Sequence, residues 1–213
     1  MDTNKKHIIN KKIEKTLENL KRNNMQALYV DNKEQLADKI KELIEEGAVV
    51  TCGGSMTLFE TGVMEHLRSG RYHLQDRYKP ELTPEQVKEI FISAFTADAY
   101  VCSSNAITEE GELYTVDGNS NRVAAMLYGP KSVIVIAGYN KIVKNIDEAV
   151  ARVQSIAAPA NAVRLNCKTP CVELGHCTNC RSKDRICCNY VVMAQQRQKD
   201  RIKVILVGDE LGY

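Results

Sequence analysis

Apolar and polar positions along the chain follow two periods, one typical of strands and the other of helices. Short runs of β-branched and small apolar residues predict buried strands at 27–30, 48–52, 97–102, 133–137 and 204–207. Apolar residues three and four positions apart predict helices at 9–20, 36–44, 84–94, 121–128, 147–157 and 189–199. Strands that alternate with helices favour an α/β fold, with a Rossmann-like and mostly parallel sheet.

Capping residues set several of the expected helix boundaries. Thr83 is followed by a proline and then by Gln86, which are the residues of a capping box with proline in the first turn. Asp31 with Glu34 resembles a second capping box. Because proline fits poorly inside a helix, we expect Pro159 to lie beyond the end of the preceding helix.

Nothing along the chain separates it into independent domains, since it has neither an internal repeat nor a low-complexity linker. We therefore expect one domain over residues 1–213. It consists of a core (10–165), a cysteine-rich insertion (166–190), and a final helix and strand (191–213). Within the core we expect a hairpin over 107–116, and a surface loop over the polar stretch 66–82.

Composition and charge narrow the classes of function. The chain has 213 residues, of which 44% are hydrophobic and 26% charged, as in globular proteins with a sizeable core. Its 29 basic and 27 acidic residues are nearly balanced, which argues against a nucleic-acid partner. No apolar run approaches the roughly 20 residues of a membrane helix, and the first residues do not resemble a signal peptide. We expect a cytoplasmic protein without a membrane partner.

The first candidate site is the turn between the strand at 48–52 and the segment after it. Gly53, Gly54 and Ser55 let the backbone approach a ligand closely, and Thr57 adds a second hydroxyl. Backbone amides at such a junction bind a phosphate or carboxylate. The alternative is an ordinary tight turn in which the serine only caps a helix. The turn is neither a Walker loop nor a dinucleotide fingerprint.

The second candidate site follows the strand at 97–102 and the expected hairpin. It combines a carboxylate, amides and a guanidinium suited to orienting a hydroxylated or carboxylated small molecule: Asn105, Asp117, Asn119, Asn121 and Arg122. The alternative is a routine Asp-Gly-Asn turn beside a solvated hairpin.

The third candidate site is the cysteine-rich insertion, because six of the eight cysteines fall between Cys167 and Cys188. Thiolates bind soft metals, and we expect Cys171, Cys177, Cys180 and Cys187 to hold an iron–sulfur cluster, with zinc as the alternative. Cys167 is the first substitute ligand.

Other residues near these thiols carry further expectations. Arg181, Lys183 and Arg185 are expected to lower the pKa of the thiols. His176 fits an ordinary loop histidine better than a metal ligand. The two remaining cysteines, Cys52 and Cys102, lie in apolar strands and are expected to be inert.

The motifs resemble those of the LUD domain family, the LutC/YkgG-like lactate-utilization proteins. The similarity is carried by Gly53-Gly54-Ser55-Met56-Thr57, Asn105-Ala106-Ile107-Thr108-Glu109 and Asp117-Gly118-Asn119, and continues through 137–143, 157–161, 169–171 and 208–213. The resemblance implies a NagB/RpiA/CoA-transferase-like fold, with the glycine turn binding an anion. Glu60, Asp117 and Asn119 match its polar rim, so we expect Glu60 and Asp117 to do acid–base or hydroxyl-orienting work.

Two functions stay open after the resemblance. The first is a role in small organic acid metabolism, redox-linked through a metal centre and involving iron–sulfur partner proteins, as the family's lactate-utilization context implies. The second is a metal-independent enzyme, or a binder of a phosphorylated sugar or CoA-like ligand, in which the cysteines hold structural zinc. The cysteine-rich insertion is not typical of the family's namesake and indicates a subgroup.

Overall fold

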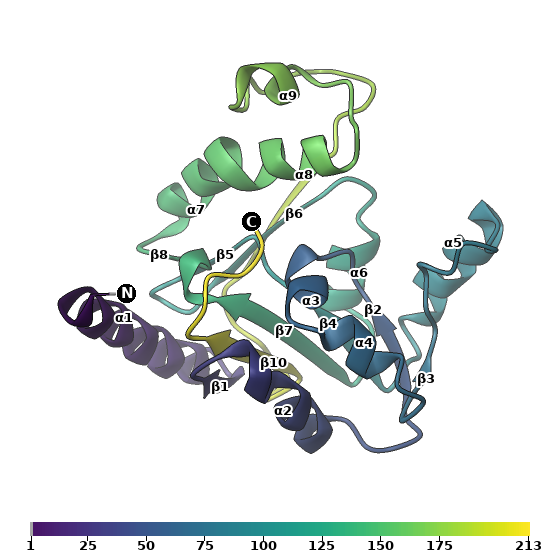
Figure 1. Ribbon diagram of the computed structural model, residues 1–213, viewed down its shortest axis with the longest axis horizontal. Coiled ribbons are helices and arrows are strands. Elements are labelled where there is room, and N and C mark those ends of the chain that lie inside the picture. Colours follow the sequence, from purple (N-terminus) through teal and green to yellow (C-terminus); the bar gives the residue numbers. More distant parts are fainter. Residues whose placement is uncertain (1) are drawn as a thin grey trace.

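A six-stranded, entirely parallel sheet organises the computed structural model, which describes residues 2–213 (Figure 1). The strand order is β1-β10-β7-β4-β2-β3. The strands are β1 (Gln26–Val30), β2 (Val49–Cys52), β3 (His73–Leu74), β4 (Ala99–Cys102), β7 (Ser132–Gly138) and β10 (Ile202–Val207). The mostly parallel α/β fold expected from the sequence is confirmed. The last strand, β10, pairs with β1 on one side and with β7 on the other, so the C-terminal part of the chain lies in the centre of the sheet.

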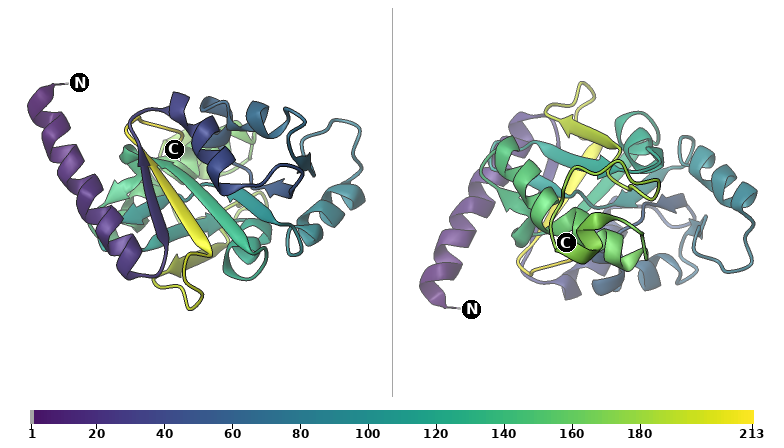
Figure 2. Two further views of the ribbon diagram at one scale, coloured as in Figure 1. Left: turned by 90° about the horizontal axis from the view of Figure 1, so that it is seen from below. Right: turned by 90° about the horizontal axis from the view of Figure 1, so that it is seen from above.

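Both faces of this sheet are covered, which explains why its strands are continuously apolar. On one face pack α2 (Leu36–Leu43), α3 (Met56–Glu60) and α4 (Val63–Leu67). The other face packs against α1 (Thr3–Arg22) and α6 (Asn121–Leu127). Helix α1 runs along the side of the molecule and projects beyond it (Figure 2).

A second, four-stranded sheet covers part of the α1 side. Its order is β8-β5-β6-β9, with β8 (Ile142–Val143), β5 (Ala106–Thr108), β6 (Leu113–Asp117) and β9 (Asn189–Met193). The predicted hairpin is its β5–β6 pair. The predicted helix at 189–199 is wrong, because residues 189–193 form β9 and pair antiparallel with β6. This stretch is rich in aromatic and β-branched residues, which favour strands.

A long helical segment lies over the second sheet (Figure 1). It consists of α7 (Ile146–Arg152), a π-helical turn (Val153–Ala157) and α8 (Ala158–Arg164). Pro159 lies in the first turn of α8 rather than beyond the helix end, which corrects the sequence-based expectation. Because Pro159 has no N–H, it cannot donate the five-residue hydrogen bond of a π-helix to the Gln154 carbonyl. That carbonyl instead accepts the Cys177 amide at 2.9 Å.

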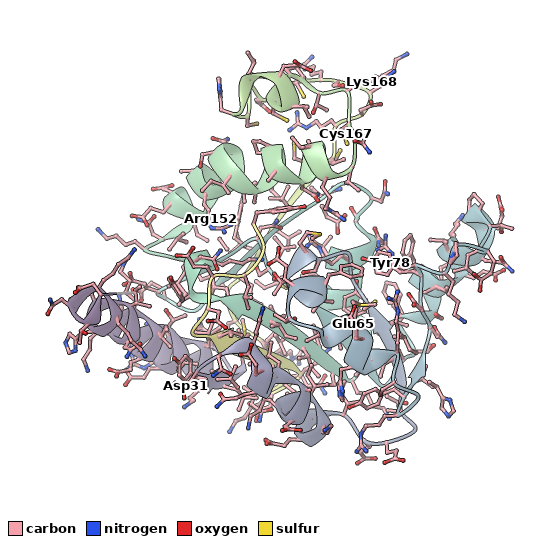
Figure 3. All side chains as sticks on the ribbon, viewed as in Figure 1. Asp31, Glu65, Tyr78, Arg152, Cys167 and Lys168 are labelled. Atoms are coloured by element: carbon pink, nitrogen blue, oxygen red, sulfur yellow. The ribbon has the colours of Figure 1, made fainter. Side chains whose placement is uncertain are left out.

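The hydrogen bond from the Cys177 amide to the Gln154 carbonyl attaches the cysteine-rich insertion to this helical segment. The insertion contains the short helix α9 (Pro170–Leu174) and lies on the outer side of α8. Cys167 opens the segment directly after α8 (Figure 3).

Two boundary predictions have different outcomes. Thr83 caps α5 (Pro84–Ser93) through a complete capping box with Gln86, as predicted. The box at Asp31 and Glu34 is absent: the 3₁₀ turn η1 (Lys33–Gln35) has Asn32 at its N-cap and no side-chain cap. A second 3₁₀ turn, η2 (Tyr139–Lys141), follows β7.

The expected loop at 66–82 contains the end of α4 and the short strand β3. Asp76 within it is buried and forms an ion pair with Arg68. None of the helices formed by residues 2–213 is both long and apolar enough to span a bilayer.

Candidate anion cavity and cysteine cluster

A cavity of about 180 Å³ lies at the carboxyl ends of β2, β4 and β7. This edge is where ligands bind in open parallel α/β sheets. The cavity is smaller than the roughly 300 Å³ or more of pockets that hold drug-sized ligands, so its size favours a small molecule. Helix α8 and Ile186 of the cysteine-rich insertion complete its wall.

Eight of the ten residues predicted to bind or act on a small molecule line this one cavity. They are Gly54, Ser55, Thr57, Asn105, Asp117, Asn119, Asn121 and Arg122. The two that do not line it are Gly53 and Glu60. The two candidate sites are therefore two sides of one space, because β2 and β4 are adjacent in the sheet.

The two glycines of the turn have different surroundings. A Cβ at Gly53 would lie 2.9 Å from Tyr100 Oη and 3.2 Å from Arg122 Cδ, so Gly53 is required by packing beneath the cavity. A Cβ at Gly54 would meet nothing closer than 3.6 Å, where Arg77 Nη1 and Tyr78 Oη lie. Gly54 is the glycine that faces the cavity.

Ser55 does not behave as an ordinary helix cap. It occupies the N-cap position of α3, yet its side chain makes no capping hydrogen bond. Ser55 is buried and lines the cavity. Helix α3 has only five residues, so its dipole contributes little to anion binding. The positive field of the site comes mainly from side chains.

Asp117 is held by the chain around it. Its Oδ1 accepts the amides of Asn119 and Ser120 at 3.2 Å, and its Oδ2 accepts that of Val123 at 3.3 Å. Arg122 Nε lies 3.6 Å from the same carboxylate. The negative charge of Asp117 is therefore already compensated by the start of α6.

Arg122 connects this loop to the one that follows β4. Its Nη2 donates to the Val116 carbonyl at 2.6 Å and to Asn105 Oδ1 at 3.2 Å. Asn105 Oδ1 also accepts the Val116 amide at 2.9 Å. These bonds fix the orientation of two predicted site residues before any ligand binds.

Lys141 is the most unusual group in the cavity. Its side chain is almost fully buried, and Nζ lies 3.0 Å from Thr57 Oγ1 and 3.1 Å from Ser103 Oγ. Burial, followed by the positive charges of Arg152 and Arg122, lowers the pKa of Lys141 to about 7, although Glu60 opposes the shift. The amine is therefore partly unprotonated near neutral pH.

Arg152 projects from the helical layer (Figure 3), and its positive charge lowers the pKa of Lys141. It lies on α7 and points to the sheets, where Nη1 donates to the Asn105 carbonyl at 2.7 Å and Nε to the Asn140 carbonyl at 3.1 Å. Arg152 thereby ties the loop after β4 to the turn that carries Lys141.

Two further arginines make the cavity strongly basic. Arg77 stacks on the Phe91 ring at 4.7 Å, and Arg164 donates twice to Asn161 Oδ1. Within residues 2–213, neither has a carboxylate within 4.0 Å. With Arg122 and Lys141, four basic side chains line the cavity against the single carboxylate of Asp117.

Three basic residues of the lining were not among the predicted site residues: Arg77, Lys141 and Arg164. For Lys141 a signal existed, since it lies three residues beyond the carboxyl end of β7. Arg77 and Arg164 have no such local signal. They come from a loop and from the end of α8, and only the tertiary fold brings them to the sheet edge.

Glu60, at the end of α3, forms a hydrogen bond with the C-terminal segment of the chain. Its Oε2 accepts the Gly212 amide at 2.7 Å. The adjacent Tyr213 lines the cavity. Glu60 thus lies just behind the cavity, and its acid–base role stays a prediction.

The four cysteines predicted as ligands line a second, smaller cavity outside α8. Its lining includes Cys171, Cys177, Cys180 and Cys187 together with Arg185. The Asn179 amide donates to Cys177 Sγ at 3.3 Å. By contrast, Cys188 is exposed, is not part of the lining, and points its thiol to the Arg185 carbonyl at 3.3 Å.

The thiols are close to one another but not preassembled. Over residues 2–213, no three His, Cys, Asp or Glu side chains are arranged to hold a metal ion. Burial raises the pKa of Cys187, more strongly than Arg185 lowers it, and burial also raises the pKa of Cys167. The expectation that nearby basic residues lower the thiol pKa is therefore wrong for these two cysteines.

Cys52, Cys102 and His176 lie outside the lining of the cysteine cavity. Burial raises the pKa of both Cys52 and Cys102 to about 12, which matches the inert role expected for them. His176 is a loop residue whose Nδ1 lies 3.0 Å from the Leu174 carbonyl.

The two cavities share a wall. Ile186 lines both of them. Two residues further on, the Cys188 amide donates to the Asp117 carbonyl at 3.1 Å. The cysteine-rich insertion is thereby bonded to the loop that forms one side of the anion cavity.

Known proteins were compared with this chain by structure and by sequence. The chain is similar to the crystal structure of a DUF162 family protein from Deinococcus radiodurans, with 17% identity, 95% of this chain and 98% of that chain covered, and a TM-score of 0.52. A partial likeness to eIF2B delta from Chaetomium thermophilum has 17% identity, covers 56% of this chain and 50% of that chain, and has a TM-score of 0.37. A comparison with curated protein sequences gives no match. The family model of the LUD domain matches residues 13–207, and the chain belongs to the LUD domain family.

Proposed function

We propose that this LUD domain protein acts in small organic acid metabolism by binding a small carboxylate or phosphate in the cavity at the sheet edge. The observation that carries the proposal is the charge of the lining, in which four basic side chains face one compensated carboxylate. An anion entering the cavity would relieve the repulsion among the three arginines of the lining. The cavity volume of about 180 Å³ favours a small anion over a CoA-sized ligand.

A thermal-shift screen across small carboxylates and phosphates tests this proposal. Arg164→Gln should weaken binding of the selected anion by about tenfold or more, because it removes a charged hydrogen-bond donor. Arg197→Gln is the matched control, since Arg197 is exposed and lies outside the cavity lining. Equal stabilisation of all three proteins by the anion would contradict the assignment.

We further propose that the cysteine cluster holds a metal centre that makes this role redox-linked. Support comes from the four thiols around one cavity, and from the backbone amide that donates to Cys177 Sγ. Donors of this kind stabilise the charge of a metal-bound thiolate. An iron–sulfur cluster would supply one-electron transfer, whereas zinc would serve only to hold the fold. The chain's own contribution is to bring Cys171, Cys177, Cys180 and Cys187 to one place.

Metal analysis after anaerobic purification distinguishes these cases. Serine at any of the four positions should lower the metal content, whereas Cys188→Ser should leave it unchanged because this thiol points elsewhere. A colourless wild-type protein without stoichiometric metal would remove the redox link. Full occupancy in both Cys177→Ser and Cys180→Ser would show that the ligand set is wrong.

The involvement of iron–sulfur partner proteins stays a prediction that rests on the family resemblance alone. Capture of such proteins by the tagged wild-type chain, and not by the Cys177→Ser variant, would support it.

A further inference from the structure

The anion cavity holds a lysine that anion binding alone does not explain. Lys141 is 3% exposed, and both of its hydrogen-bond partners, Thr57 Oγ1 and Ser103 Oγ, are neutral hydroxyls. A buried ammonium group is costly unless it is paired with a carboxylate. No ion pair provides one here within residues 2–213. The site therefore favours the neutral amine.

The charged groups around Lys141 act in the same direction. Arg152 on α7 and Arg122 on α6 both disfavour its protonation, and Glu60 on α3 only partly opposes them. Ser103 Oγ donates to the Ser104 carbonyl at 3.3 Å, so it accepts from Lys141. Thr57 Oγ1 is 3.0 Å from Nζ on the other side. The amine is held by one hydroxyl on α3 and one on the loop after β4, while Lys141 lines the cavity.

We propose that Lys141 is the nucleophile of this cavity and forms a Schiff base with a small anion that carries an aldehyde or ketone carbonyl. The inference rests on the proposed anion site, because the arginines would hold the carboxylate or phosphate while the amine reaches the carbonyl carbon. A buried, unpaired amine among cations is the environment in which lysines become nucleophilic.

The step balances without any oxidant, reductant or cofactor. The Nζ lone pair attacks the carbonyl carbon, a carbon–nitrogen bond forms, and the carbonyl oxygen leaves as water with the two amine hydrogens. Thr57 and Ser103 orient the amine for this attack. The resulting imine would withdraw electrons from the adjacent carbon of the ligand.

Reductive trapping of the full-length protein tests the inference. The protein is incubated with cyanoborohydride and either pyruvate, a carboxylate, or dihydroxyacetone phosphate, a phosphate, and the adduct is mapped by peptide mass spectrometry. We expect one adduct per chain at Lys141 with one of the two probes, and labelling that accelerates as the pH rises from about 6 to 8. Uncharged dihydroxyacetone should label Lys141 at least tenfold more slowly, because the arginines cannot hold it.

Two variants serve as controls. Lys141→Arg keeps a positive charge and should lose the adduct, whereas Lys203→Arg should keep it. Lys203 serves as the control because it is half-buried, lies outside the cavity and donates to the Asp200 carbonyl. Trapping on the wild-type protein is decisive even if Lys141→Arg does not fold.

The failures of the two proposals are distinguishable. Calorimetric binding of either anion without a Lys141 adduct would overturn the nucleophile and leave the anion site standing. Labelling spread over surface lysines at equal rates would also overturn it. Absence of both binding and adduct would overturn the anion site and this inference together.

Discussion

At the scale of single residues, neighbours with similar chemistry have different roles. Gly53 is enclosed by Tyr100, Arg122 and Cys102, whereas Gly54 borders open space beside Arg77. The sequence motif presents them as equivalent, because a pair of glycines contains no information about which one faces the ligand. Only the packing of β4 and α6 around the turn distinguishes them.

Replacing each glycine by alanine separates these roles. Gly53→Ala should lower the free energy of unfolding by about 1–3 kcal/mol, because the added methyl group meets buried atoms at 2.9–3.2 Å. Gly54→Ala should fold with nearly wild-type stability yet bind the anion more weakly, since its methyl group lies next to Arg77. Chemical denaturation and calorimetry measure the two quantities. The reverse pattern would contradict the geometry.

Lys141 makes stability depend on pH. Its pKa is lowered to about 7 in the fold, so between pH 7 and its ordinary value near 10.5 the unfolded chain binds more protons at this site. Stability from this group is therefore expected to rise with pH across that range, with a limiting slope of about 1.4 kcal/mol per pH unit.

The comparison with Lys141→Met isolates this effect. The difference in the free energy of unfolding between wild type and variant should shift in favour of wild type from pH 7 to 8.5, a window below the ordinary pKa of cysteine thiols near 9. A difference that is constant with pH would show that Lys141 remains protonated in the fold.

At the scale of elements, local chemistry predicted helix starts only where a capping residue makes its bond. Thr83 Oγ1 accepts the Gln86 backbone amide at 3.3 Å, and Gln86 Oε1 accepts the Thr83 backbone amide at 2.9 Å. Ser55 occupies the same kind of position without a side-chain bond. The residue type alone does not reveal whether a hydroxyl caps a helix or faces a ligand.

Alanine substitutions at these two positions form a matched pair. Thr83→Ala should lower stability by about 1 kcal/mol, because α5 loses its cap. Ser55→Ala should change stability by less than that, and should weaken anion binding because Ser55 lines the cavity. Thermal denaturation and anion titration of both variants check this. A stability loss in Ser55→Ala equal to that in Thr83→Ala, without a change in affinity, would make Ser55 an ordinary cap.

Elements that depend on distant partners were harder to predict. Strand β9 is stabilised by pairing with β6, some 70 residues earlier in the chain. The helix containing Pro159 continues because a π-helical turn accommodates the missing N–H. Neither the pairing of β9 with β6 nor the π-helical turn can be predicted from the local pattern of apolar residues.

At the scale of the whole molecule, the parallel sheet was predictable because its buried strands are short, apolar and β-branched. The carboxyl-edge rule placed Asn105 and Asp117 in a candidate site separate from the glycine turn, and the structure brings the two sites together in one cavity. The basic character of that site was not predictable from a net charge of +2. It arises because the fold concentrates basic groups from separate segments at one edge.

These basic groups are expected to bind one small anion together. Calorimetric titration with L-lactate, pyruvate and inorganic phosphate tests it directly, using wild type, Arg77→Gln/Arg164→Gln and the exposed control Arg197→Gln/Lys199→Gln. We expect saturable one-to-one binding of at least one anion to wild type and the control, and at least tenfold weaker binding to the cavity variant. No saturable binding to wild type, or equal binding to all three proteins, would contradict it.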